Sequence, residues 1–215
     1  MITISLIRHA ESYANKRGLL DGKLPGKSLS DCGKSQINPL ALKIQESRLV
    51  YNRVYVSPFN RTRETYCLLN KTIDRKWHLT NHQISFGIKE LDYGNLNGKK
   101  FSDYELSINE IWNNAKAGKY QERYGEIGES QEEYFSRIYS FLGKIIKRDN
   151  RTLMIITHEC VCRAIIWIYN NLQKREKIEN KINLADIKTL IFFPEDVDKF
   201  KKLILEFRSG TKKRV

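Results

Sequence analysis

Two histidines and two arginines stand where they could carry out chemistry on a phosphate group. His9 and His158 each lie at the end of a short, mostly apolar run. Arg8 precedes the first histidine, and Arg61 follows another such run. Guanidinium groups match phosphate oxygens with paired hydrogen bonds, and an imidazole nitrogen can attack phosphorus to form a covalent phosphohistidine. One such residue alone is usually structural, but four of them brought together would repel one another and would instead suit a dianion.

The elements that must position these residues alternate along the chain. Short apolar runs predict buried strands at 2–7, 53–56, 153–157 and 188–193, with weaker strands at 84–91 and 203–207. Helical patterns lie between them, at 30–47, after Pro58 through Leu69, and at 101–124, 130–147 and 161–172. This alternation predicts a three-layer α/β/α sandwich with a mostly parallel central sheet. Reactive groups gather at the carboxyl ends of such strands, where our four residues fall.

Two of the helices carry further signals. Ser130 and Glu133 form a capping-box pattern at the start of the helix predicted over 130–147. Pro39 lies inside the pattern at 30–47 and predicts a kink there.

The composition limits the class of protein. The chain has 215 residues, of which 40% are hydrophobic and 29% charged, and we expect one domain over 1–215. No apolar run approaches the roughly 18–20 residues needed to cross a bilayer, and the N-terminus lacks the pattern of a signal peptide. The four cysteines form neither a disulfide framework nor a zinc motif. We therefore expect a cytoplasmic protein with no metal and no membrane partner.

A strong positive charge is the unusual feature of the composition. The formal net charge is +13, and the segment 199–215 holds seven basic residues against one acidic residue, Glu206. A basic surface concentrates anions, whether phosphorylated metabolites, nucleic acid or acidic lipid, but does not choose among them. The charge alone leaves the role of this basic end open, and the sequence leaves the oligomeric state open.

Several blocks of sequence resemble the histidine phosphatase superfamily, also called the phosphoglycerate mutase-like fold. LIRHAES at 6–12 is similar to the family signature, and Asn15 falls where the pattern RHGxTxxN has its asparagine. SPFNRTRETY at 57–66 resembles SPLxRAxQTA, and ELDYGNLNG at 90–98 resembles ExxxGxxxG. IITHECVCRAII at 155–166 resembles the second histidine block, SHGGVIRAL.

Two further blocks fill the gaps between these. Asp21-Gly22 and then Leu29-Ser30 are similar to the block that follows the signature, and GESQEEYFSRI at 128–138 resembles a helix start of the family. The blocks appear in the family's order over almost the whole chain, so the resemblance is specific.

The resemblance implies roles for the residues that match. His9 would be the nucleophile, and Arg8, Arg61 and His158 would bind the phosphoryl oxygens and stabilise the transition state. Asn15 would add a hydrogen bond. Neither a metal nor another cofactor is implied, because the arginines and the second histidine supply the positive charge that a metal supplies elsewhere.

The proton donor has two candidates. The resemblance makes Glu90 the general acid of the first half-reaction and the base that activates water in the second. Glu159 stands where Gly is common in the family, and another branch uses an acidic residue at that position as the donor. We prefer Glu90, and Glu159 could instead narrow the pocket or bind a cationic part of the substrate. Gly22 completes the expected substrate-binding set.

Within the family, the sequence favours a phosphatase. Mutases generally carry extra elements between the glutamate block and the second histidine block, and here only 68 positions separate Glu90 from His158. We expect hydrolysis of a small phosphorylated metabolite, with specificity set by a variable, cap-like segment at about 99–128. A mutase-type phosphotransferase is the alternative, and so is a non-catalytic module of the same fold that binds phosphate or nucleic acid. The intact set of site residues argues against a nucleic-acid partner.

Overall fold

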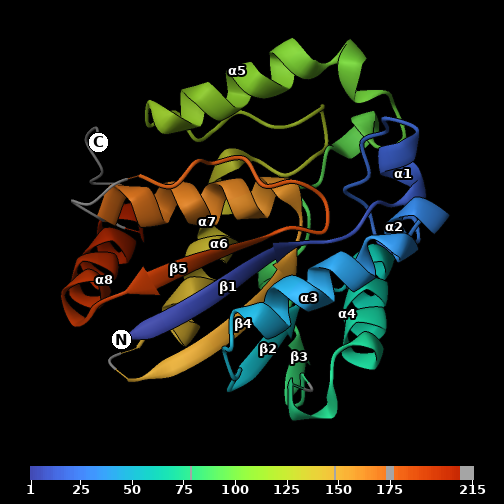
Figure 1. The fold of residues 1–215 in the computed structure, drawn as a ribbon. Helices are drawn as coiled ribbons and strands as arrows, with labels where there is room; N and C mark the ends of the chain where they lie inside the picture. The colour runs from blue at the N-terminus through green and yellow to red at the C-terminus, as the bar shows by residue number, and fades with distance from the viewer. Residues whose placement is uncertain (78, 148, 173–176, 209–215) are drawn as a thin grey trace.

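A five-stranded sheet forms the centre of the protein. The computed structural model describes residues 1–77, 79–147, 149–172 and 177–208. The strands are β1 (Ile2–Arg8), β2 (Arg53–Val56), β3 (His82–Ile84), β4 (Arg151–Thr157) and β5 (Ile187–Phe192). They lie in the order β3-β2-β4-β1-β5, and neighbours are parallel except β5, which is antiparallel to β1 (Figure 1).

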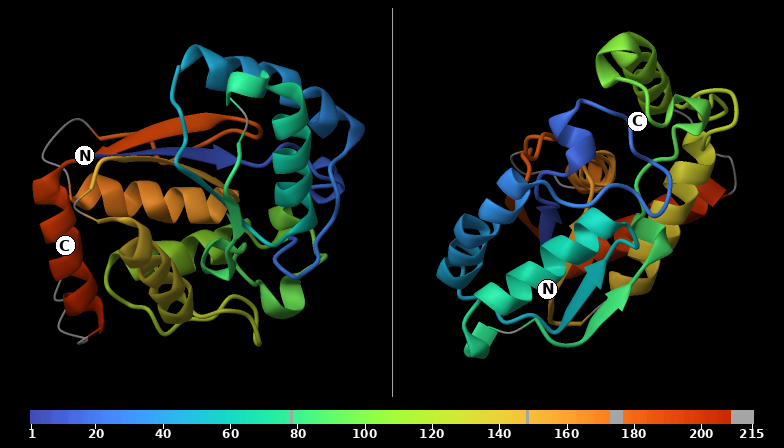
Figure 2. Two further views of the ribbon diagram at one scale, coloured as in Figure 1. Left: turned by 90° about the horizontal axis from the view of Figure 1, so that it is seen from below. Right: turned by 90° about the vertical axis from the view of Figure 1, so that its right-hand side faces the viewer.

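Helices cover both faces of the sheet. In chain order they are α1 (Tyr13–Lys16), α2 (Asp31–Ser35), α3 (Ile37–Glu46), α4 (Asn60–Thr72), α5 (Glu105–Lys116), α6 (Gln131–Ile145), α7 (Glu159–Leu172) and α8 (Pro194–Arg208). α3 and α4 pack on one face, and α6, α7 and α8 pack on the other (Figure 2). This is the three-layer α/β/α sandwich with a mostly parallel sheet that the sequence predicts.

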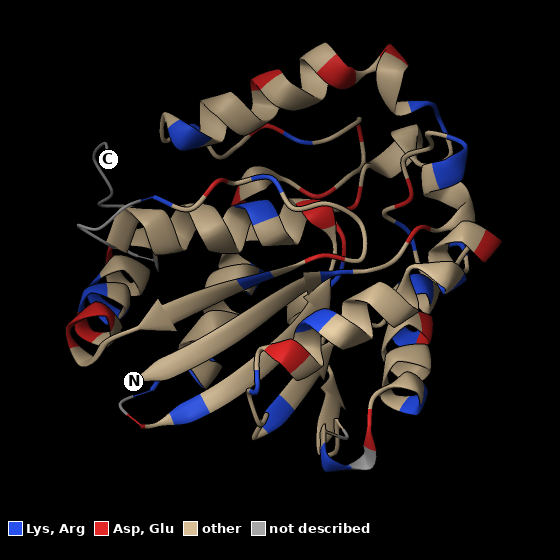
Figure 3. Ribbon diagram, viewed as in Figure 1, with Lys and Arg blue, Asp and Glu red and all other residues tan. Residues whose placement is uncertain are grey.

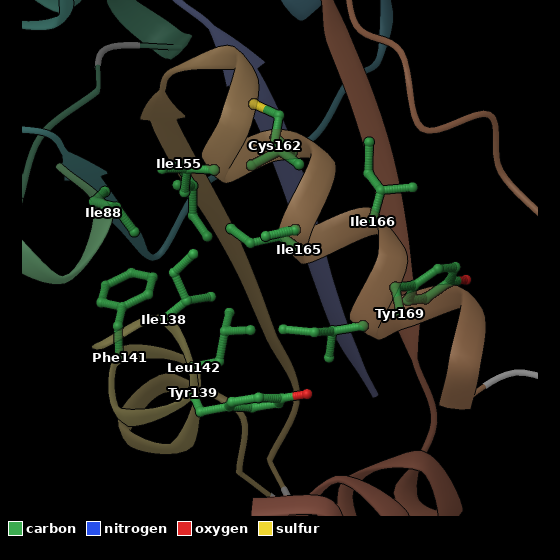
Figure 4. Close-up of a cluster of buried hydrophobic side chains, with 14 of the residues drawn as sticks. Ile88, Ile138, Tyr139, Phe141, Leu142, Ile155, Cys162, Ile165, Ile166 and Tyr169 are labelled. Atoms are coloured by element: carbon green, nitrogen blue, oxygen red, sulfur yellow. The ribbon is translucent and has the colours of Figure 1, made fainter. Parts of the chain in front are cut away.

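The strands are buried on both sides because their apolar residues alternate between two cores. In β1, Ile4 and Leu6 join the core under α6 and α7, whereas Ile7 joins the core under α3 and α4. Figure 4 shows the larger core, with Ile155 of β4 lying among side chains of α6 and α7. Burial on both faces explains why the strands read as continuous apolar runs.

Some predicted elements differ from the observed ones. The strand predicted over 203–207 is wrong, because these residues belong to α8. Val197, Phe200 and Leu203 recur at a spacing of three residues and are buried along one side of that helix. A five-residue apolar run cannot by itself distinguish a strand from a piece of helix.

Other boundaries were predicted only approximately. The helix expected over 30–47 is two helices, α2 and α3, which meet at Gln36. Pro39 lies in the first turn of α3, where its missing N–H is tolerated, and so it does not kink a long helix. The weak strand expected over 84–91 is instead the short edge strand β3, followed by a 3₁₀ turn over Phe86–Ile88.

Two predicted helices can be compared with the observed ones at their ends. Ser130 caps α6 in a capping box with Glu133, as predicted. The helix expected over 101–124 is shorter, because α5 ends at Lys116.

Within the described residues, no helix is both long and apolar enough to span a membrane. Residues 209–215 of the basic C-terminal end lie outside the described part of the chain.

Candidate active site

Neighbouring strands bring the two histidines together. β1 and β4 run parallel with Arg8 opposite Thr157, so the next residue on each strand is a histidine at the same edge. The backbone N–H of His9 donates to the carbonyl oxygen of Thr157 at 2.9 Å, which fixes this register beyond the ends of the strands. The two imidazole centroids lie 5.1 Å apart, and the rings of His9 and His158 are almost completely buried.

The segment that follows β2 places an arginine next to the two histidines. After β2 the chain turns at Ser57-Pro58, and α4 begins at Asn60, which places Arg61 in the first helical turn. The Nε–H of Arg61 lies 3.1 Å from Nε2 of His9 and 3.2 Å from Nδ1 of His158. Three residues that are far apart in the sequence therefore converge on one point.

Hydrogen bonds indicate which nitrogen of each imidazole carries the proton and which one is an acceptor. Nδ1 of His9 lies 2.7 Å from the carbonyl oxygen of Ala10, so this nitrogen carries the proton and Nε2 carries the lone pair. Nε2 of His158 lies 2.7 Å from the hydroxyl of Ser57, and Nδ1 of the same ring accepts from Arg61.

Both imidazoles are neutral near neutral pH. Burial lowers the pKa of His9 and of His158 well below the ordinary value, and the charge of Arg61 lowers both further. A neutral His9 keeps an unprotonated Nε2, which is the form that a nucleophile requires, and in this structure Nε2 accepts from Arg61.

Glu90 supplies a buried carboxyl group to the same place. It follows the 3₁₀ turn at Phe86–Ile88, and its Oε2 lies 3.9 Å from Nδ1 of His158. Burial raises the pKa of Glu90 to about 7, although Arg61 acts in the opposite direction. A carboxyl group with this pKa can both give and take a proton near neutral pH, as a general acid and base must.

A buried ion pair holds the backbone that carries this carboxyl group. Arg137 of α6 contacts Glu129 through two nitrogens, at 2.6 and 2.9 Å. The same guanidinium donates to the carbonyl oxygens of Gly87 and Glu90. The block at 128–138 that the resemblance singled out therefore fixes the loop of Glu90.

Two carboxylates pair with the arginines of the site. Nη2 of Arg8 lies 2.6 Å from Oε2 of Glu159, and Nη1 of Arg61 lies 2.9 Å from Oδ2 of Asp21. The role of Asp21 was missed from the sequence, although it stands in the block that resembles the family. Charges of both signs thus surround the carboxyl ends of β1 and β4 (Figure 3).

A cavity of about 250 Å³ opens beside these groups. Of the predicted site residues, it is lined by Arg8, His9, Asn15, Arg61, Glu90 and Glu159. Two residues of the cap-like segment, Phe101 and Ile108, form part of its wall. Tyr93, Cys160 and Arg163 also line it, and none of these was assigned to the site from the sequence.

Two predicted residues lie beside the cavity rather than in its wall. His158 is fully buried behind His9 and Arg61, which it contacts directly. Gly22 packs against the loop of Glu90, and a Cβ atom on it would lie 1.9 Å from the carbonyl oxygen of Leu91. Close packing therefore explains the glycine.

Asn15 reaches the cavity from the first turn after β1. Its Oδ1 accepts from the backbone N–H and the hydroxyl of Ser12 in a capping box, at 3.0 and 2.8 Å. These bonds orient the amide, whose Nδ2 group is the donor that the cavity wall can offer to an anion.

Together these groups have the charge and the nucleophile to bind a dianion such as a phosphate group and to react with it. Two guanidinium groups, a neutral imidazole with its lone pair on Nε2 and a carboxyl group with a pKa of about 7 meet at one cavity. In the described ranges, no three His, Cys, Asp or Glu side chains gather in a way that could hold a metal ion.

Known proteins share this sequence pattern and fold. The chain matches the family model of the histidine phosphatase superfamily (branch 1) over residues 4–199. A relative from Hydrogenobacter thermophilus, named phosphoserine phosphatase 1, is 26% identical over 166 residues, or 77% of this chain and 74% of the relative.

Solved structures show the same architecture. The structure of phosphoglycerate mutase from Thermus thermophilus has a TM-score of 0.63 at 18% identity, covering 87% of this chain and 91% of that one. The product of an open reading frame of Mycobacterium tuberculosis has a TM-score of 0.66 at 20% identity, covering 89% and 92%. At these identities the likeness shows the fold alone. Because the family match runs from β1 into α8, the chain belongs to the histidine phosphatase superfamily, branch 1.

Proposed function

We propose that the protein is a metal-independent phosphomonoester hydrolase that acts on a small phosphorylated metabolite through a phosphohistidine at His9. The observation that carries this proposal is that Nε of Arg61 lies within 3.2 Å of a nitrogen of both His9 and His158, beside a cavity that Glu90 also lines. No structural requirement of a merely folded α/β domain would collect these groups at one sheet edge, because their burial is costly.

The first half-reaction transfers the phosphoryl group to the protein. Nε2 of His9 attacks phosphorus, and the bond between phosphorus and the ester oxygen breaks. Glu90, protonated at pH values below about 7, gives its proton to the departing oxygen. Arg8 and Arg61 bind the phosphoryl oxygens and stabilise the charge of the transition state.

The second half-reaction returns the protein to its starting state. A water molecule attacks the phosphorus of the phosphohistidine, and the ionised Glu90 accepts a proton from this water. The bond between nitrogen and phosphorus breaks, releasing inorganic phosphate and restoring the lone pair of His9. His158 acts in both steps as the partner that orients Arg61 and faces the developing charge.

The position of Glu159 favours Glu90 as the proton donor. The carboxylate of Glu159 is already engaged in an ion pair with Arg8, at 2.6 Å. Oε1 of Glu90 accepts only a backbone N–H, from Leu91 at 2.9 Å, among the contacts of the described residues, and burial raises the pKa of Glu90 to about 7. Glu159 instead lies in the cavity wall, where it can limit the size of the leaving group or bind a cationic part of it.

The names of the relatives fit both reactions that can follow formation of the phosphohistidine, hydrolysis and transfer back to the product. Water completes a phosphatase cycle, as the name phosphoserine phosphatase describes, whereas return of the group to the product completes a mutase cycle. The short segment between Glu90 and His158 supports hydrolysis, because it leaves few elements to hold a product in place during the second step.

Phosphate release from a panel of phosphomonoesters tests the proposal. We expect release from an aryl phosphate and from small metabolites with EDTA present, and none from the His9→Ala variant. Faster interconversion of phosphoglycerates than hydrolysis would favour the mutase. Salt-dependent nucleic-acid binding without any hydrolysis would favour the non-catalytic module.

A further inference from the structure

Arg163 is the one arginine in the cavity wall for which the described residues provide no acidic partner. The other two are paired, Arg8 with Glu159 and Arg61 with Asp21. Within the described part of the chain, Arg163 makes neither a hydrogen bond nor an ion pair of the kind that holds the other arginines. Its guanidinium group is therefore available to a ligand.

The nearest obvious partner of Arg163 is already engaged. Glu159 and Arg163 stand four residues apart on α7, which places them on one face of the helix with a rise of about 6 Å between them. Oppositely charged residues at this spacing commonly pair, yet the Glu159 carboxylate binds Arg8 instead. Figure 3 shows this order along α7, with an acidic start followed by a basic turn.

Lys116, the last residue of α5, lies near the same tryptophan ring as Arg163. The guanidinium carbon of Arg163 lies 5.1 Å from the ring centroid of Trp112, and Nζ of Lys116 lies 5.7 Å from the same centroid. Burial and the charge of Arg163 together lower the pKa of Lys116. Two cations that share one aromatic ring repel each other, and a bound anion would relieve that repulsion.

Arg163 lines the same cavity as the residues expected to bind phosphate. Arg163 lines the cavity together with Arg8 and His9, and Ile108 of α5 lines the apolar wall between α5 and α7. The volume of about 250 Å³ is that of a pocket for a small molecule or a small chemical group. A ligand in the cavity can therefore contact both His9 and the guanidinium group of Arg163.

We propose that Arg163 binds a second anionic group of the substrate. The substrate is then a small phosphomonoester whose leaving group carries a carboxylate or another phosphate. This inference rests on the proposed function, because it assumes that one phosphoryl group lies at His9. A carboxylate and a phosphate both present paired oxygens that can accept two hydrogen bonds from one guanidinium group.

Matched pairs of substrates test the second anionic group. Phosphoserine and phosphoethanolamine share a phosphate and an amine and differ in one carboxylate. Fructose 1,6-bisphosphate and fructose 6-phosphate differ in one phosphate. We expect the wild type to prefer the doubly anionic member of at least one pair, and the pair it discriminates identifies the source of the charge.

Substitution of Arg163 tests its role in that preference. In Arg163→Gln we expect the ratio of kcat/KM between the two members of the preferred pair to fall about 10- to 100-fold, mainly through KM, because one charge-assisted hydrogen-bonding group is lost. Lys116→Gln should lower the ratio less. Arg63→Gln is the matched control, since Arg63 is exposed on α4 and outside the cavity, and the ratio should not change.

Two further measurements make the result decisive. Turnover of an aryl phosphate by Arg163→Gln shows that the variant is folded, and Arg163→Lys should recover part of the ratio. Equilibrium binding of the same pairs to His9→Ala, with and without Arg163→Gln, tests the subsite even without turnover. The subsite is overturned if both members of each pair behave alike, or if Arg163→Gln leaves the ratio unchanged. Hydrolysis of aryl phosphate without such a preference would leave the proposed function standing.

Discussion

The Nε–H of Arg61 donates a hydrogen bond to Nε2 of His9 at 3.1 Å. The residue expected to bind phosphate thus also contacts the lone pair of the expected nucleophile. Asp21 holds the other end of the same guanidinium, at 2.9 Å from Nη1. The guanidinium group of Arg61 is therefore already oriented without a ligand. Its planar shape, with several N–H donors, sets this orientation together with its charge.

Arg61→Lys separates these two contributions. Lysine keeps the positive charge but cannot contact both imidazoles and Asp21 at once. We expect kcat/KM for an aryl phosphate to fall about 10²- to 10³-fold. Steady-state kinetics measures this, with Arg63→Lys on the same helix as a control that should retain activity. Activity of Arg61→Lys within tenfold of the wild type would mean that charge alone suffices.

Glu90 should determine the pH dependence of hydrolysis. The first half-reaction needs its protonated form, which is lost as the pH rises through a pKa of about 7. For an alkyl phosphate we expect kcat/KM to fall up to tenfold per pH unit above that value. An aryl phosphate with a good leaving group should show a weaker fall, and Glu90→Gln should remove the fall altogether. A steep alkaline limb that survives in Glu90→Gln would point to another acid, with Glu159 the first to test.

The same carboxyl group should make the folded state less stable at high pH. Its pKa is about 7 in the folded state against an ordinary value of 4.5, so the folded state keeps a proton that the unfolded chain has lost. Stability therefore declines between about pH 4.5 and 7 by roughly 3 kcal/mol at most. Glu90→Gln should be more stable than the wild type at pH 8, and the difference should disappear near pH 4. Urea unfolding at both values measures it, and an equal difference at both would contradict the assignment.

The pair of Glu129 and Arg137 should support both folding and activity. Arg137→Met removes the guanidinium partner of the buried Glu129 carboxylate and leaves the more distant Lys89, at 3.9 Å, so it should cost roughly 3 kcal/mol. The double variant Glu129→Gln/Arg137→Met should recover most of that stability. It should not recover kcat, because the guanidinium no longer holds the carbonyl oxygen of Glu90. Recovery of kcat along with stability would show that the pair is purely structural.

The sequence predicted the central part of the site because strand ends obey simple rules. His9 and His158 lie at the ends of short, mostly apolar runs, and such runs become neighbouring parallel strands whose carboxyl ends share an edge. The resemblance to the family then pointed to Arg61 and Glu90, which the structure places at the same cavity as His9. The structure adds the register, since only pairing of Arg8 with Thr157 places both imidazoles side by side.

The side-chain partners could not be predicted in this way. Asp21, Glu159 and Arg163 are all charged residues near a motif, and the sequence does not show which cation each acid meets. That choice depends on rotamers and on distances between segments. The end of the chain was misjudged for a related reason, because LILEF at 203–207 fits a strand locally and only its packing against the core makes it a helix.

A phosphoenzyme on His9 is the most direct test of the account. The protein is mixed with an aryl phosphate, quenched within the first turnover, and analysed by intact mass and peptide mapping under basic conditions. We predict one added phosphoryl group on His9 that is lost in acid and is absent from His9→Ala. Turnover with the phosphoryl group on another residue, or with no covalent intermediate in wild type and Glu90→Gln alike, would contradict it.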